Sequence, residues 1–110
     1  MALACAGPMK LLAILRPPAD GDVAAAAASK ALEELHTGWD LYRSGFVREI
    51  YSPDGGLGAV LIVEAGSVQE AQERLLALPL VAAGIMEMEL IALHPFWAAE
   101  MLFEGGVTRV

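Results

Sequence analysis

The sequence predicts a single α+β domain built on an antiparallel sheet. Two runs of residues are apolar on both alternating sets of positions, which is typical of strands covered on both faces. Two other runs alternate apolar and charged residues, as edge strands do, and two stretches with helical periodicity separate the strands. The length of 110 residues fits one domain. We expect this domain at residues 9–95, between a flexible leader at 1–8 and a C-terminal interface tail at 96–110.

The first strand is expected at residues 9–16, where two prolines end it. Asp20 or Asp22 is placed to cap the following helix by accepting a backbone N–H. This helix is expected to run to about Ser44. Its apolar stripe at helical spacing consists of Ala24, Ala28, Ala31, Leu32, Leu35, Gly38, Trp39 and Tyr42.

A hairpin is expected next. Gly45 is placed to end the helix in a left-handed cap, and residues 46–51 then alternate as an edge strand does. The segment 52–56, Ser-Pro-Asp-Gly-Gly, is a turn by composition. Residues 57–64 form the second run that is apolar on both sets.

The second helix and the last strand complete the domain. Ser67-Val68-Gln69-Glu70 has the capping-box pattern, in which the serine and glutamate side chains satisfy exposed backbone N–H groups. We expect this helix to end before Pro79 and a half-charged strand to follow at 86–93.

The resulting order, β-α-β-β-α-β, predicts a ferredoxin-like antiparallel sheet with two helices on one face and the strand order 4-1-3-2. The first and third strands are then central, which agrees with their apolar character. The sheet face without helices exposes a broad apolar surface, larger than a soluble monomer usually tolerates. We therefore expect a second subunit to cover it, in a homodimer or a multiple of dimers that forms a dimeric α+β barrel.

Composition excludes several classes of function. The formal net charge of −7 argues against nucleic acid as a partner, because nucleic-acid binding relies on clustered Lys and Arg. Apolar runs stay well short of the ~20 residues of a membrane span, so no membrane partner is expected. The single cysteine, Cys5, rules out an internal disulfide, and we expect a cytoplasmic protein without a secretory signal. The sequence has no phosphate loop, metal motif or catalytic triad, so we expect the protein to use neither a metal nor a cofactor.

Three residues of the first helix could carry chemistry. His36, Trp39 and Arg43 lie at i, i+3 and i+7 along one border of the apolar stripe. In a functional interpretation, His36 is a general acid or base, Arg43 anchors a carboxylate and Trp39 forms an apolar wall. In a structural interpretation, His36 pairs with Asp40 on the surface and Trp39 belongs to the core.

The edge strands hold a second set of charged residues. Arg48 and Glu49 on one edge, and Glu87 and Glu89 on the other, could be solvated charges or ion pairs at a dimer seam. Arg48 and Glu87 have apolar neighbours, and a partly desolvated carboxylate has a raised pKa that suits proton transfer.

One stretch resembles a known family. Leu-Pro-Leu at 78–80, the alternating acidic strand and His94-Pro95 follow one another at the distances found in muconolactone isomerases, members of the dimeric α+β barrel superfamily. The resemblance implies a cofactor-independent isomerase of aromatic compound catabolism, which moves a proton between carbons of a small unsaturated lactone acid. For such an enzyme, the expected places of the residues on the first helix and the edge strands suggest which of them act. The proton carriers are His36 and Glu87, and the substrate-binding residues are Trp39, Tyr42, Arg43 and Arg48.

Other functions remain open. The chain could be a non-catalytic dimeric protein that binds a small acid or an aromatic-derived compound, an accessory protein, or a cofactor-free monooxygenase of the same superfamily. After His94-Pro95, the tail gathers Phe96, Trp97, Met101, Leu102 and Phe103. We expect this apolar tail to pack across the dimer or to build a larger assembly, with a role as a lid as the alternative.

Overall fold

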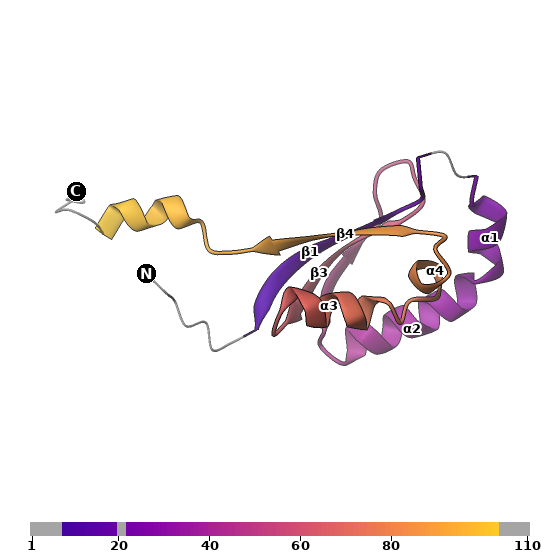
Figure 1. Cartoon of the computed structure of the whole chain (residues 1–110), viewed down its shortest axis with the longest axis horizontal. Coiled ribbons are helices and arrows are strands. Elements are labelled where there is room, and N and C mark those ends of the chain that lie inside the picture. Colours follow the sequence, from indigo (N-terminus) through magenta and orange to yellow (C-terminus); the bar gives the residue numbers. More distant parts are fainter. Residues whose placement is uncertain (1–7, 20–21, 104–110) are drawn as a thin grey trace.

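The computed structural model describes residues 8–19 and 22–103 (Figure 1). The strands are β1 (Met9–Arg16), β2 (Val47–Tyr51), β3 (Ala59–Ala65) and β4 (Glu87–Leu93). The helices are α1 (Ala24–Ser29), α2 (Ala31–Arg43), α3 (Val68–Leu75) and α4 (Pro79–Ala82), and a 3-10 helix, η1 (Trp97–Phe103), follows β4. Except for Pro8, the predicted leader with Cys5 lies outside the described residues, as do Asp20 and the tail beyond residue 103.

The four strands form one antiparallel sheet in the order β2-β3-β1-β4, so the predicted α+β class is confirmed. The strands β1 and β3 are central, as their apolar sequences predict, and the charged strands β2 and β4 lie at the edges. The first strand has the predicted bounds, and the β2–β3 pair is the predicted hairpin.

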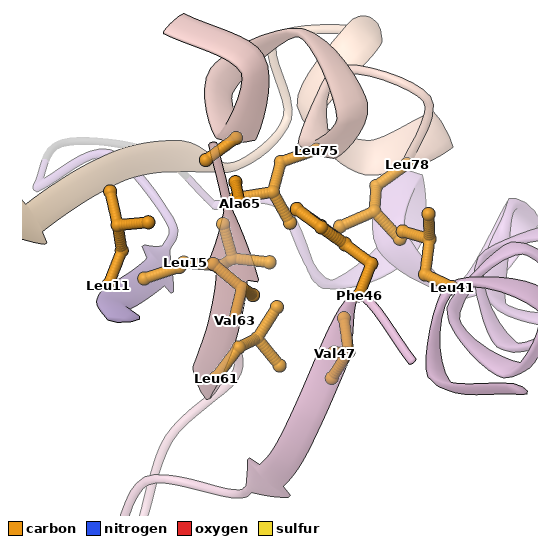
Figure 2. Packing of buried hydrophobic residues seen from close by; sticks show 12 residues of the cluster. Leu11, Leu15, Leu41, Phe46, Val47, Leu61, Val63, Ala65, Leu75 and Leu78 are labelled. Atoms are coloured by element: carbon orange, nitrogen blue, oxygen red, sulfur yellow. The ribbon is translucent and has the colours of Figure 1, made fainter. Parts of the chain in front are cut away.

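The core lies between the sheet and the helices on one of its faces. Alternate residues of the two central strands are buried there: Leu11, Ala13 and Leu15 of β1, and Leu61, Val63 and Ala65 of β3. Figure 1 shows α2 and α3 along this face. The cluster is completed by Leu41 of α2, Val47 of β2, Ala71 and Leu75 of α3, and Phe46 and Leu78 from the connections (Figure 2).

The first predicted helix is divided, which corrects its expected bounds. α1 ends at Ser29 and α2 starts at Ala31, because Lys30 has a non-helical backbone (φ −117°, ψ 10°). Only Ala27 of α1 is buried, so packing does not hold α1 in line with α2. Asp22 does not act as the cap, since α1 begins after Val23 without a side-chain cap hydrogen bond.

The second predicted helix ends before Pro79, as expected, because α3 ends at Leu75. A short helix that the sequence did not predict, α4, begins at Pro79. Proline is favoured at a first helical position, where no intrahelical N–H bond is lost. The expected cap is confirmed at the start of α3: Glu70 N–H donates to Ser67 Oγ at 3.0 Å, and Gly66 N–H donates to Glu70 Oε1 at 3.1 Å.

The other face of the sheet is apolar at its centre. Residues directly opposite one another in the register, such as Leu12 with Ile62 and Ile91, share this face and are only half-buried or exposed. We call it the open sheet face; its apolar residues are Leu12, Ile14, Val60, Ile62, Ile91 and Leu93. An Arg16–Glu89 ion pair (2.5 Å) lies at its border. The apolar second face that the sequence predicts is therefore present.

Candidate functional site

A cavity of about 900 Å³ lies between the helices α1 and α2 and the β2–β3 side of the sheet. Most of its wall is apolar, with contributions from Ala27, Ala31, Leu35, Trp39, Leu57 and Met86. A volume of this size is within the range of small-molecule sites, which are concave and mostly apolar with a few polar groups.

The apolar stripe of α2 forms one side of this cavity. Leu35 is 69% exposed and Trp39 is 57% exposed, so these side chains border open space instead of packing against the sheet. The interpretation of Trp39 as a core residue is therefore wrong. Its ring stacks on that of Tyr42, with 5.8 Å between the centroids, and both residues line the cavity. The two rings together provide a flat apolar surface for a ligand.

Glu34 is the carboxylate that α2 places in the cavity wall. The side chain is half-buried, and Leu80 N–H at the start of α4 donates to its Oε1 at 2.9 Å. Burial raises the pKa of Glu34, and the hydrogen bond from Leu80 opposes this effect in part. Sequence reasoning missed this residue. The signal was available, because Glu34 lies three residues after Ala31 and four before Gly38, within the apolar stripe.

Arg48 is the cationic residue among those that line the cavity, but its guanidinium lies beside Glu64, which does not line it. The register of β2 shifts between Val47 and Glu49, so Arg48 lies at an irregularity of the β2–β3 ladder. Its Nε is 3.7 Å from Glu64 Oε2, and about half of the Arg48 side chain is exposed. To bind an anion in the cavity, the guanidinium would have to turn from Glu64 toward the cavity.

Glu49 also lines the cavity and interacts with its neighbour Tyr51. Tyr51 OH donates a hydrogen bond to Glu49 Oε1 at 2.5 Å. This hydrogen bond and the negative charge of Glu49 raise the pKa of Tyr51. The phenol occupies one oxygen of Glu49.

The predicted site residues separate into two groups. Trp39, Tyr42 and Arg48 line the cavity together. His36 and Arg43 are exposed on α2 and are not part of the cavity wall.

Glu87 lies elsewhere in the chain. It is opposite Arg16 in the β1–β4 register, beside a small hollow at the border of the open sheet face. Within one chain, therefore, the two predicted proton carriers His36 and Glu87 do not meet at the cavity.

The cavity combines three chemical features. Glu34 is a carboxylate whose raised pKa brings proton exchange closer to neutral pH. Arg48 can bind a carboxylate, and the apolar wall excludes water from whatever lies against it. In the part of the chain that the structure describes, no three His, Cys, Asp or Glu side chains are grouped to hold a metal ion, and no helix is long and apolar enough to cross a membrane.

No known protein-family model matches this chain, and no curated protein gives a significant match. The resemblance of residues 78–95 to muconolactone isomerases therefore stays a prediction. The geometry of the cavity is the main guide to function.

Proposed function

We propose that the protein is a cofactor-independent isomerase that binds a small, largely apolar carboxylic acid in the cavity and moves a proton between two of its carbons. The observation that carries this proposal is the half-buried carboxylate of Glu34, which has a raised pKa and shares an apolar cavity with Arg48. A proton carrier, an anion anchor and a dry wall are what such a reaction needs. The resemblance to muconolactone isomerases suggests a small unsaturated lactone acid as the substrate.

In this proposal Glu34 is the proton carrier. Its carboxylate removes a proton from the carbon next to the substrate carbonyl, and the electron pair moves into a conjugated enolate. The protonated Glu34 then returns the proton to a second carbon of the conjugated system, so the double bond shifts and no oxidant is consumed. A positioned acid or base typically contributes about 100- to 10,000-fold to such a step.

Arg48 holds the substrate carboxylate, and the Trp39–Tyr42 stack supports the ring of the substrate. Binding through Arg48 fixes the reacting carbon relative to Glu34, which lowers the entropic part of the barrier. We assign proton transfer to Glu34 rather than to His36 and Glu87, because these two residues lie outside the cavity. Arg43 is outside it as well, which favours Arg48 as the anchor.

We also propose that the chain has the ferredoxin-like arrangement and pairs into a dimeric α+β barrel. The support is the apolar centre of the open sheet face, since two such faces bury each other when sheets pack face to face. The border charges, Arg16 and Glu89 among them, would then form the rim of the interface.

The test is proton exchange in D₂O. A panel of small unsaturated lactone acids is incubated with the parent protein, and exchange at the acidic carbon is followed by NMR. Glu34→Gln should lower the exchange rate by about 100-fold or more, because the amide cannot accept the proton. Arg48→Met should mainly raise KM, because it removes the anchor of the substrate carboxylate.

The matched control is Glu33→Gln, the same change at an exposed neighbour that does not line the cavity. This variant should keep the parental exchange rate. Equal exchange in Glu34→Gln and the parent, or no exchange in the parent with any acid of the panel, would contradict the isomerase proposal.

A second candidate is a binding protein without turnover. It is favoured by the largely apolar cavity wall, where Ala24, Ala27, Ala28 and Ala31 offer no reactive group. With Trp97 replaced by phenylalanine so that only Trp39 emits, saturable quenching of its fluorescence by an aromatic acid, equal with and without Glu34→Gln and without exchange in D₂O, would support this candidate.

A further inference from the structure

The chain after β4 carries large apolar side chains that the molecule itself leaves uncovered. Phe96 is 77% exposed, Trp97 is 73% exposed and Phe103 is 85% exposed. Met101 and Leu102 are also exposed, and η1 has no buried residue. We call residues 96–103 the C-terminal arm. An exposed apolar segment of this kind marks an interaction site.

The arm does not lie against the cavity of its own chain. Leu93 at the end of β4 is opposite Lys10 at the start of β1, whereas the cavity borders Leu15 and Ala59 at the other end of the same paired strands. Lys10 and Leu15 are five positions apart in β1, roughly 17 Å along the strand. Figure 1 shows the arm continuing past the end of β4, away from α1 and α2.

We propose that the C-terminal arm of one copy docks at the mouth of the cavity of a second copy. The mouth exposes Leu35, Trp39 and Leu57, which are 69%, 57% and 48% exposed, respectively. A short apolar helix matches a concave apolar surface, which is a common mode of helix recognition. The open sheet face suits a different partner, because a sheet face is best covered by another sheet. The two uncovered apolar surfaces therefore have two different partners within the assembly.

Docking of the arm completes the site. The cavity volume of about 900 Å³ is near the upper end for a small-ligand site, so it has room for aromatic side chains of the arm as well as a small ligand. The arm then closes the mouth and leaves the part beside Glu34 to the ligand. This consequence rests on the proposed function, because exclusion of water assists proton transfer at Glu34. The docking itself does not depend on it.

The experiment measures disulfide formation between different chains of the full-length protein. Cys5→Ser provides a background without the native thiol, since Cys5 is the single cysteine. Protein with Phe103→Cys is mixed with protein carrying Leu35→Cys at the cavity mouth, and subunits are allowed to exchange before mild oxidation. A matched mixture replaces Leu35→Cys by Ile91→Cys, which lies on the open sheet face and is 39% exposed.

Docking at the cavity mouth should make the 103–35 disulfide form at least about tenfold faster than the 103–91 disulfide, because docked thiols have an effective concentration near the millimolar range. Mass spectrometry of the linked peptides identifies the pair. A preference for position 91 would place the arm on the open sheet face, and equal or absent cross-linking would show that the arm does not dock on a second copy. Either result overturns the proposal.

A third mixture tests the choice of a second copy. The double variant Leu35→Cys, Phe103→Cys, diluted with an excess of Cys5→Ser protein before oxidation, should give little disulfide within one chain. Efficient cross-linking within one chain would overturn the proposal. None of these measurements requires a ligand or turnover, so a failure of the proposed isomerase activity leaves their outcome unaffected.

Discussion

Glu33 and Glu34 are neighbours in α2, yet only Glu34 lines the cavity. Successive residues of a helix are rotated by about 100°, so one position is enough to move a carboxylate from solvent to an apolar wall. The exposed Glu33 retains its hydration, whereas the half-buried Glu34 loses part of it and has a raised pKa. A step of one position along α2 therefore decides whether a glutamate belongs to the site.

The raised pKa of Glu34 predicts a pH-dependent effect of Glu34→Gln on stability. Because folding raises this pKa, protonation of Glu34 favours the folded state, and the contribution is full below the unfolded value of 4.5 and lost as the pH rises through the folded value. Glutamine does not titrate, so the variant does not lose this contribution to stability as the pH rises. Its amide oxygen can still accept a hydrogen bond from Leu80 N–H. Relative to the parent, the variant should therefore become more stable as the pH rises from 4 to 7.5.

Urea unfolding of both proteins at pH 4 and pH 7.5 measures this difference. The change should be on the order of 0.5 kcal/mol, because solvent still reaches a half-buried carboxylate and screens it. Glu33→Gln is the control and should show no comparable trend. A relative stability of Glu34→Gln that falls with rising pH would contradict the prediction.

Gly58 has a backbone conformation that only glycine accepts easily. Its φ is +124°, and a Cβ atom at this position would overlap the carbonyl oxygen of Leu15. Gly56 in the same loop has open space around the position of its Cβ. We expect Gly58→Ala to lower the free energy of unfolding by about 1–3 kcal/mol. Gly56→Ala should have little effect on it. Thermal unfolding of both variants measures this, and equal melting temperatures would contradict the expected strain at Gly58.

At the scale of single elements, α1 and α3 differ in how capping and packing stabilise them. α3 begins with a complete side-chain cap, whereas α1 begins without one and has only one buried residue. α3 also places Ala71 and Leu75 in the core. Local signals and packing thus agree for α3, and neither fixes α1 strongly.

The cap of α3 predicts the effect of Ser67→Ala. The substitution removes the oxygen that accepts from Glu70 N–H at 3.0 Å, so we expect a loss of about 1 kcal/mol in the free energy of unfolding. Urea unfolding with a control, Ser52→Ala at an exposed position of the β2–β3 connection, measures the difference. A cost no greater than that of Ser52→Ala would mean that the capping bond contributes nothing to stability.

At the scale of the whole molecule, the sheet separates two kinds of surface. One face meets the helices and, beside them, the cavity; the other is the open sheet face with its apolar centre. Helices on one side cannot cover both faces, so the second face is available to another copy. The proposed dimer would bury this face.

The proposed dimer predicts the effect of Ile62→Lys. Ile62 is half-buried at the centre of the open sheet face, opposite Leu12. A lysine there should weaken self-association by at least about 30-fold, the equivalent of about 2 kcal/mol, because its charge would be buried in the interface without a partner. Light scattering at low micromolar concentration measures the change.

The control for Ile62→Lys is Leu76→Lys, at an exposed position after α3. This variant should associate as the parent does. A folded parent that is monomeric at these concentrations would contradict the dimer.

Several features follow from the sequence alone, because they depend on neighbours along the chain. The bounds of β1, the left-handed conformation of Gly45 (φ +89°) and the cap at Ser67 agree with the predictions. The central positions of β1 and β3 also follow, since alternation of side chains shows which strands are covered on both faces. These signals are local, and tertiary packing did not override them.

Which residues line the cavity was decided only by the tertiary structure. A helical stripe can either pack on a sheet or line a cavity, and periodicity is the same in both cases. The distance between α2 and the sheet made Trp39 a cavity residue and brought Glu34 near Leu80, 46 positions further along the chain. The same geometry put Arg48 in the cavity wall and left His36 outside it. The sequence therefore determined which faces are apolar, whereas the spacing between elements determined which residues share the cavity, because that spacing depends on contacts between distant segments.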